Sequence, residues 1–314
     1  MLKKTVKILS PIIAMLFLLI AVYALYNQLQ AHSLAEIIQI IVNIPIHRIL
    51  IASSLVFLSY FILTCYDYVG LLFMQKPMSY KRITFTSFLS YVFSLNVGMP
   101  VLTGGVVRIK YYYNWGLTMI EIAELMAFIT LTFFIGFFNV TGLSLIINPI
   151  KIPAVFNLPI ENTRLFGIII FSILSIYILF CLFEKGSISL FGKTFRFPSK
   201  KIMLMQVLTG SMDFIVLGTI FYVLLPAGIG LSYFQFIIYF LLAQVSGIVS
   251  NVPGGIGVFD TIMISLLSPS IPSSTIFGTL LVYRLIYYII PLIFGLIIAG
   301  VYEARSFFRR DSSN

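Results

Sequence analysis

Long apolar runs recur along this chain and constrain its fold more than any other feature. They occupy residues 8–26, 49–74, 118–147, 165–183, 202–225 and 276–302. A helix needs about 17–25 residues to cross a hydrocarbon core roughly 30 Å thick, and each run reaches that length. Because 60% of all residues are hydrophobic and only 10% are charged, no soluble domain has room between the runs. The sequence therefore predicts an all-α integral membrane protein with one polytopic domain, residues 1–314.

The basic residues predict the topology. The formal net charge is +10, and most of the 20 lysines and arginines lie in short clusters between the apolar runs. This spread does not form the single patch of a nucleic-acid-binding surface, and it favours anionic membrane lipids as partners. Cytoplasmic loops carry an excess of Lys and Arg. We therefore expect both termini in the cytoplasm, on the same side as the clusters at residues 3–7, 76–82, 108–110, 185–201 and 305–310.

Two segments must enter and leave the membrane by the same face if all these clusters share one side. Residues 83–107 separate two of the clusters, and Asn96 to Pro100 followed by Thr103 to Gly105 would break a helix there. By the same argument, residues 233–267 begin and end on the opposite side. The break in that segment is Pro253-Gly254-Gly255-Ile256-Gly257. We expect about six full crossings plus two broken, re-entrant helical hairpins.

The order of these elements predicts an inverted-topology repeat. Residues 1–150 contain two helices, a broken hairpin and a further helix, and residues 151–314 repeat this order from the other face. Asp67 and Asp213 lie on corresponding helices of the two halves. Interrupted segments in matching positions are typical of transporters, whose sites lie near the bilayer midplane.

The glycines of the second break have two interpretations. Irregular backbone at membrane depth is tolerated only where protein buries it or water reaches it. The glycines from Gly254 to Gly257 would then direct free N–H groups toward an anion, such as a lipid phosphate, at the start of the next half-helix. Alternatively, Pro253 only kinks a helix that its neighbours support.

Charged residues within the apolar runs are the strongest candidates for a site. A charge near the bilayer centre costs at least about 2.5–3.5 kcal/mol, so such residues face the protein interior and find partners. We expect Arg108 to pair with Asp67, and Arg284 to pair with Asp260 or Asp213. In a functional site the arginines meet a phosphate, while the carboxylates hold a cationic headgroup or a proton. In the alternative, the ion pairs only lock helices together.

The segment around Arg284 also carries tyrosines. Arg284, Tyr287, Tyr288 and Pro291 share one face of a regular helix, which would line a polar path. Tyrosines near helix ends are often interfacial anchors instead, and the sequence leaves both interpretations open.

No catalytic constellation is visible. Serines and threonines lack an accompanying histidine, and no nucleotide-binding fingerprint occurs. Cys65 and Cys181 offer no metal-ligand spacing, and His32 and His47 have no companions. We therefore expect no cofactor and no metal, and the sequence favours a protein that is not an enzyme.

Taken together, the motifs resemble the membrane region of the lysylphosphatidylglycerol synthase/flippase family, the multiple peptide resistance factors of bacteria. The resemblance extends in order over essentially the whole chain, and Asp260 stands where many family members have Glu. It is carried by Tyr66-Asp67, by Gly104-Gly105-Val106-Val107-Arg108, by Ser246-Gly247 with Pro253-Gly254-Gly255-Ile256-Gly257-Val258-Phe259-Asp260, and by Tyr283-Arg284 with Tyr287-Tyr288 and Pro291.

The resemblance implies a flippase in the bacterial cytoplasmic membrane, which moves an anionic or aminoacylated phospholipid such as lysylphosphatidylglycerol and protects against cationic antimicrobial peptides. The chain ends soon after its last apolar run, so we expect the family's synthase domain to be absent. A separate synthase or glycosyltransferase is an expected partner, and a homo-oligomer stays open. The alternative is a membrane subunit or scaffold for a lipid-linked aminoacyl- or glycosyltransferase pathway. The expected headgroup and translocation residues are Asp67, Gly104, Gly105, Arg108, Asp213, Pro253, Gly254, Gly255, Gly257, Asp260, Tyr283, Arg284 and Tyr287.

Overall fold

A computed structural model of the chain describes residues 34–97, 100–150, 163–183, 187–190, 193–228, 230–250 and 252–311. Within these ranges, five helical stretches are long and apolar enough to cross a membrane. Each coincides with one of the six apolar runs, and the run at residues 8–26 lies outside the described residues. The predicted all-α membrane fold is therefore confirmed. The five stretches are α3 (Ile46–Phe73), α6 (Met119–Ile147), α7 (Arg164–Phe183), α8 (Lys200–Leu224) and the continuous stretch Ser273–Arg305.

The last of these stretches consists of three elements. Helix α11 (Ser273–Arg284) passes into the π-helical turn η3 (Leu285–Ile289) and then into α12 (Ile290–Asp311). The short helix α2 (Leu34–Val42) packs against α11. A small antiparallel hairpin of β1 (Ser187–Leu190) and β2 (Lys193–Arg196) connects α7 to α8, and the sequence did not predict it.

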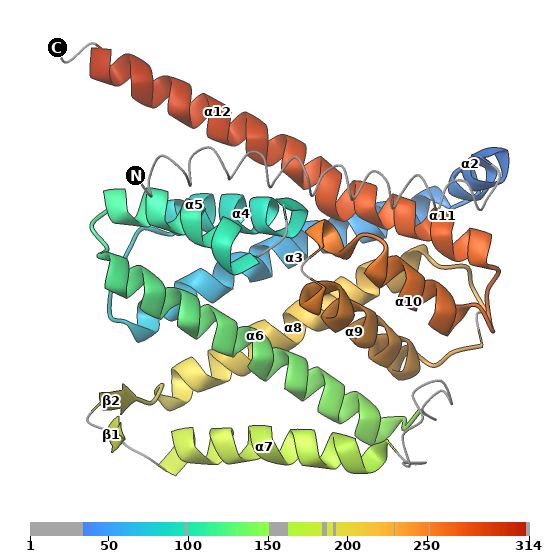
Figure 1. Cartoon of the computed structure of the whole chain (residues 1–314), viewed down its shortest axis with the longest axis horizontal. Helices are drawn as coiled ribbons and strands as arrows, with labels where there is room; N and C mark the ends of the chain where they lie inside the picture. Colours follow the sequence, from blue (N-terminus) through green and yellow to red (C-terminus); the bar gives the residue numbers. More distant parts are fainter. Residues whose placement is uncertain are drawn as a thin grey trace.

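Helices α3 and α8 pack against each other at the centre, and α6 crosses α8 beside them (Figure 1). The α6–α8 crossing brings two glycines together. A side-chain carbon placed on Gly210 would lie 2.9 Å from the Cα of Gly136 and 2.5 Å from the carbonyl oxygen of Thr132. Small residues let membrane helices approach to backbone contact. Gln206 of α8 also donates a hydrogen bond to the hydroxyl of Thr132 at 3.0 Å, so this crossing is both close and polar.

Both predicted broken elements are present. Helix α4 (Tyr80–Val97) and helix α5 (Pro100–Asn114) are two separate helices that lie side by side, and residues 98–99 between them lie outside the described residues. Helix α9 (Tyr233–Val249) is followed by the 3-10 turn η2 (Pro253–Gly255) and by α10 (Val258–Leu267). In Figure 1, α4 and α5 extend to the left from the middle of the molecule, and α9 and α10 extend to the right.

The predicted break in the first element was too long. Gly104 and Gly105 lie inside helix α5 and not in the break. A side-chain carbon on Gly104 would meet the carbonyl oxygen of Ser90 at 3.3 Å, and one on Gly105 would meet Met126 at 2.7 Å. These glycines therefore allow α5 to pack tightly between α4 and α6.

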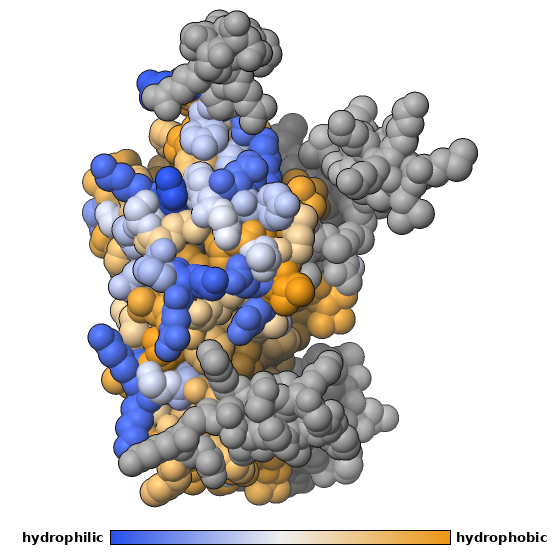
Figure 2. All heavy atoms as spheres, turned by 90° about the vertical axis from the view of Figure 1, so that its left-hand side faces the viewer, coloured by the Kyte–Doolittle hydropathy of each residue, from blue (hydrophilic) through white to orange (hydrophobic). Residues whose placement is uncertain are grey.

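The ends of the first broken element meet at one end of the molecule, as the charge distribution predicted. Lys76, just after α3, pairs with Glu121 of α6 at 2.6 Å, and Lys110 of α5 pairs with Glu303 of α12 at 2.8 Å. Arg82 at the start of α4 lies over the ring of Trp115, which follows α5. Figure 2 looks onto this end and shows hydrophilic side chains gathered across it.

Candidate functional site

The first buried ion pair joins α5 to α3, as predicted. The Nε of Arg108 donates to Oδ1 of Asp67 at 2.9 Å, and its Nη2 donates to Oδ2 at 2.8 Å. The hydroxyls of Tyr112 and Ser87 each donate to one of the same two oxygens at 3.0 Å. Asp67 is 0% exposed and Arg108 is 5% exposed. A carboxylate with two bonds on each oxygen is fully satisfied, which allows this charge to be buried.

The second ion pair holds the break after α9 in place. Arg284 of α11 donates from Nη2 and Nε to Oδ1 of Asp260, at 2.7 and 3.2 Å. Its Nη1 donates to the carbonyl oxygen of Gly254 at 3.1 Å. The sequence left Asp260 and Asp213 open as partners of Arg284, and the structure selects Asp260. One side chain thereby connects α11 both to η2 and to the first turn of α10.

The start of α10 is already occupied by a carboxylate. Oδ2 of Asp260 accepts a hydrogen bond from the backbone N–H of Gly257 at 2.8 Å, and the N–H of Gly255 bonds the carbonyl oxygen of Val252 at 2.9 Å. We predicted that these glycines direct free N–H groups at a phosphate. That prediction is wrong for Gly255 and Gly257, because Asp260 supplies the anion at this helix start.

All three glycines of this segment have backbone conformations that other residues rarely adopt, and Gly257 is at φ +83°. Gly254 has φ +58° and Gly255 has φ +62°. Gly255 also crosses α9 closely, since a side-chain carbon there would lie 3.2 Å from the Cα of Gly247. The turn therefore needs glycine for two reasons, its left-handed backbone and its contact with α9.

A proline explains the π-helical turn η3. Pro291 has no N–H to bond the carbonyl oxygen of Tyr287, four residues earlier. The hydroxyl of Tyr60 donates to that oxygen instead, at 3.1 Å, and the N–H of Ile290 bonds the carbonyl oxygen of Leu285 in the π-helical pattern. Membrane helices tolerate proline when neighbouring groups satisfy the released backbone in this way.

The interruptions in three elements meet at one place. A side-chain carbon on Gly254 in η2 would lie 3.6 Å from the carbonyl oxygen of Leu95, near the end of α4. The amide of Asn96 at the same end of α4 donates to the carbonyl oxygen of Tyr288 in η3 at 3.3 Å. The end of α4, the turn η2 and the turn η3 are thus adjacent, with Arg284 bound to η2 just before η3.

The tyrosines of η3 face the interior, so the interfacial-anchor interpretation is wrong for them. Tyr287 is buried and its ring stacks on that of Tyr283, with centroids 5.6 Å apart. Tyr288 is also buried and lies beneath the guanidinium of Arg284 at 5.7 Å. We predicted that Arg284 and Tyr287, three residues apart, share one helical face. In the π-helical turn the contacts are instead between residues four apart, Tyr283 with Tyr287 and Arg284 with Tyr288.

Asp213 is separate from Asp67 and Asp260, the carboxylates that bind the two arginines. Its Oδ2 accepts a hydrogen bond from the hydroxyl of Tyr66 at 2.9 Å, which joins α8 to α3. Its Oδ1 has no hydrogen-bond partner among the described residues, although Asp213 is only 5% exposed. Tyr91 connects this carboxylate to the first ion pair, because its ring lies 6.2 Å from that of Tyr66 and 4.9 Å from the guanidinium carbon of Arg108.

Sequence reasoning missed several members of this site. Ser87 and Tyr91 are four residues apart on α4, where polar groups interrupt an apolar pattern, and this spacing was the available signal. Tyr112 and Tyr60 gave no such signal, since aromatic residues are frequent throughout the chain. Of the expected site residues, the side chain of Pro253 lies outside the described part of the structure. No group of three or more His, Cys, Asp or Glu residues that could hold a metal occurs in that described part.

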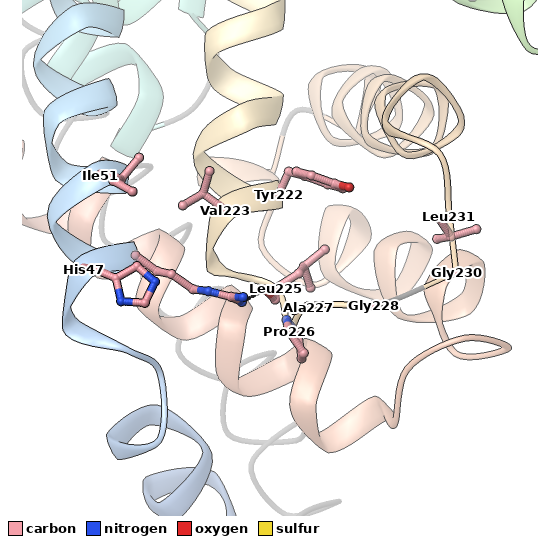
Figure 3. A pocket seen from close by; sticks show the side chains of 11 residues that line it. His47, Ile51, Tyr222, Val223, Leu225, Pro226, Ala227, Gly228, Gly230 and Leu231 are labelled. Atoms are coloured by element: carbon pink, nitrogen blue, oxygen red, sulfur yellow. Dashed lines mark hydrogen bonds between the residues drawn. The ribbon is translucent and has the colours of Figure 1, made fainter.

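A separate hollow lies at the end of α3 that is opposite Lys76. It has a volume of 380 Å³ and is lined by residues of the first turns of α3, of the last turn of α8 and of the segment that follows α8, including His47, Arg48, Tyr222 and Leu231 (Figure 3). Arg48 donates to the carbonyl oxygen of Leu225, the residue that ends α8. This contact fixes the start of α3 against the end of α8.

Comparison with known proteins places the chain among membrane proteins. No family model matches it. The uncharacterized protein slr0712 of Synechocystis is 32% identical over 305 residues, which are 96% of this chain and 94% of that protein. The inner membrane protein YbhN of Escherichia coli is 30% identical over 261 residues, covering 82% of this chain and 81% of YbhN.

A second group of relatives matches only in part. The phosphatidylglycerol lysyltransferase of Staphylococcus haemolyticus is 33% identical over 94 residues, which are 29% of this chain and 11% of that enzyme. The Staphylococcus aureus (strain COL) enzyme of the same name is 37% identical over 70 residues, 22% of this chain and 8% of the enzyme. The chain is thus a multi-pass membrane protein, and it belongs to the family that includes the inner membrane protein YbhN.

Proposed function

We propose that the protein is a flippase-like lipid transporter, which moves an anionic or aminoacylated phospholipid between the two leaflets. The observation that supports this most strongly is the meeting of α4, η2 and η3 around Arg284. Transporters build their sites from discontinuous helices at the interface of two repeats, where irregular backbone and buried charges face each other. A helical bundle that only spans the membrane needs neither irregular backbone nor buried charges.

Each of the two arginines would exchange its aspartate carboxylate for the phosphate of a lipid headgroup. In the structure, Arg108 binds Asp67 and Arg284 binds Asp260, so each carboxylate occupies the position that a lipid phosphate would take. Arginine binds carboxylate and phosphate with similar geometry. Displacement of the carboxylate by a headgroup phosphate would change the contacts of α3 or α10, which couples binding to a rearrangement.

Only the headgroup must pass through the protein interior. The acyl chains can remain in the bilayer beside the bundle, where exposed apolar residues such as Phe57 of α3 and Leu208 of α8 face outward. A narrow polar path that includes Arg108, Tyr91 and Asp213 would then be sufficient.

The partial relatives support a phospholipid as substrate, because the lysyltransferases are named for phosphatidylglycerol. We propose further that residues 1–150 and 151–314 are the two inverted halves, and that the protein lies in a bacterial inner membrane with both termini in the cytoplasm. A separate synthase or glycosyltransferase that makes the lipid would be the natural partner.

Lipid sidedness in cells tests this proposal. Outer-leaflet lipids are labelled with an impermeant amine- or headgroup-reactive reagent and identified by untargeted lipidomics, in cells with and without the chain. We expect one class of anionic or aminoacylated phospholipid to lose outer-leaflet labelling when the chain is absent, while its total amount stays constant. A fall in the total amount instead would support the alternative, a subunit or scaffold of a lipid-synthesising enzyme.

A further inference from the structure

The carboxylates of the site differ in how well they are satisfied. Asp67 accepts hydrogen bonds from Arg108, Tyr112 and Ser87, and Asp260 accepts them from Arg284 and the backbone of Gly257. Asp213 accepts one bond, from the hydroxyl of Tyr66. Its Oδ1 is buried without a hydrogen-bond partner in the part of the chain that the structure describes. Burying an ionised carboxylate without a cationic partner costs free energy. Binding a cation therefore stabilises such a carboxylate more than it stabilises one that is already paired.

Among the residues that the structure describes, none supplies Asp213 with a fixed cation. The titratable groups that interact with it are Tyr66 of α3, Tyr91 of α4 and Tyr287 of η3. Arg108 and Arg284 each bind another carboxylate. Helix α6 approaches α8 next to Asp213 through the neutral amide of Asn139, which donates to Ser211 at 2.7 Å. Helix α9, which also packs against α8, carries no Asp, Glu, Lys, Arg or His.

The limited space around Asp213 favours a small cation over a large one. Asp213 is 5% exposed and bonded to Tyr66 of α3, so a lipid ammonium group could reach it only if α3 and α8 moved apart. A metal ion needs several oxygen ligands, and the hydroxyl of Tyr66 donates to the carboxylate and therefore points its hydrogen toward it. A proton needs no additional room and no additional ligand.

We propose that Asp213 is a proton-binding site, and that its protonation and deprotonation accompany lipid movement. The proton from water adds to Oδ1, because Oδ2 already accepts the Tyr66 hydrogen bond, and the carboxylate becomes a neutral carboxyl group. Release of the proton to water restores the carboxylate. Protonation removes the charge that strengthens the Tyr66–Asp213 bond, so it weakens a link between the two central helices α3 and α8. The coupling to lipid movement rests on the proposed function, whereas the proton site does not.

Infrared difference spectroscopy tests the proton site without any transport. Spectra of the protein in lipid bilayers are recorded from about pH 4 to about pH 9, a range that covers ordinary and buried carboxyl groups. We expect a carboxyl C=O band that changes with pH in the wild type and in Glu124→Gln, which removes an exposed carboxylate of α6. The band should be missing from Asp213→Asn. Superimposable spectra of wild type and Asp213→Asn would overturn the proposal.

A second variant keeps the test valid if Asp213→Asn does not fold. Tyr66→Phe removes the hydrogen bond to Oδ2, which favours the charged form, so the midpoint of the same band should move to higher pH. An unchanged midpoint would contradict a proton on Asp213.

Coupling is measured in vesicles that contain a fluorescent phosphatidylglycerol. An imposed pH gradient should change the rate of lipid movement several-fold in wild type and Glu124→Gln, but not in Asp213→Asn. Gradient-independent movement in all three proteins would overturn the coupling. If none of them moves lipid, the proposed function fails, while the infrared bands still decide whether Asp213 binds a proton.

Discussion

Arg284 donates a hydrogen bond from Nη1 to the carbonyl oxygen of Gly254 across 3.1 Å, and it does so while its other nitrogens hold Asp260. The guanidinium therefore bonds residues on both sides of the bend between η2 and α10. A planar group with several N–H donors can make these bonds at once, whereas an ammonium group is a single compact charge. The shape of the broken element thus depends on the geometry of this side chain as well as on its charge.

Replacing Arg284 by Lys should separate geometry from charge. Arg284→Lys retains the positive charge but has one donor nitrogen in place of three, so it cannot reproduce the three hydrogen bonds to Asp260 and Gly254. We therefore expect a loss of about 1–2 kcal/mol in unfolding free energy. Unfolding in detergent, followed by circular dichroism, measures this loss. Arg305→Lys, at an exposed position of α12, is the matched control and should leave the stability unchanged. Equal stability of both variants and wild type would contradict the inference that the geometry of the Arg284 guanidinium group stabilises the fold.

The glycines of η2 should differ in their tolerance of alanine. A left-handed backbone costs alanine about 1–2 kcal/mol at either position. Gly255→Ala should cost more than Gly254→Ala, because its side chain would also press on Gly247, 3.2 Å away. Gly228→Ala isolates the backbone cost, since Gly228 has φ +74° and open space around it. Thermal unfolding of the three variants gives the order, and a Gly255→Ala variant as stable as Gly228→Ala would disprove the close crossing with α9.

The Arg108–Asp67 pair should show strong energetic coupling. Removing one partner leaves the other charge buried alone, which costs about 3–5 kcal/mol. We therefore expect Arg108→Gln and Asp67→Asn each to be strongly destabilising, and the double variant to cost clearly less than the sum of the two. A double-mutant cycle of unfolding free energies measures this coupling. Additive effects would mean that the two side chains do not depend on each other.

The α6–α8 crossing should be intolerant of any side chain. Gly136→Ala places a methyl group against the backbone of Gly210, so the helices must separate and lose the bond from Gln206 to Thr132. We expect poor folding or a large drop in the unfolding temperature. Gly300→Ala on α12 has no atom within 4 Å of the new carbon and should be neutral or slightly stabilising. Similar unfolding temperatures for the two variants would argue against backbone contact at this crossing.

Apolar length and charge placement determined how much of the fold was predictable. The five described spans, both broken elements and the Arg108–Asp67 pair follow from the cost of placing charges and irregular backbone in lipid. The capping box at the start of α6 also depends on local spacing, because Thr118 and Glu121 bond each other's backbone within one turn. Such features depend on spacing along the chain alone.

The remaining features depend on contacts between distant segments. Tyr66 and Asp213 are separated by 147 positions, and nothing in their local sequence indicates that they meet. The π-helical turn before Pro291 requires Tyr60 to satisfy the released carbonyl oxygen, and this again becomes visible only in the fold. For the same reason, the sequence could not distinguish Asp260 from Asp213 as the partner of Arg284.

Lipid translocation by the purified chain tests the central claim most directly. The protein is reconstituted into vesicles with a fluorescent phosphatidylglycerol, and an impermeant reductant bleaches the label in the outer leaflet. With wild type and Arg305→Lys, we expect the bleached fraction to rise well above that of protein-free vesicles. With Arg108→Ala and Arg284→Ala, inserted to the same level, it should return to the protein-free value. Bleaching by wild type that matches protein-free vesicles, or by both alanine variants that matches wild type, would contradict lipid transport through this site.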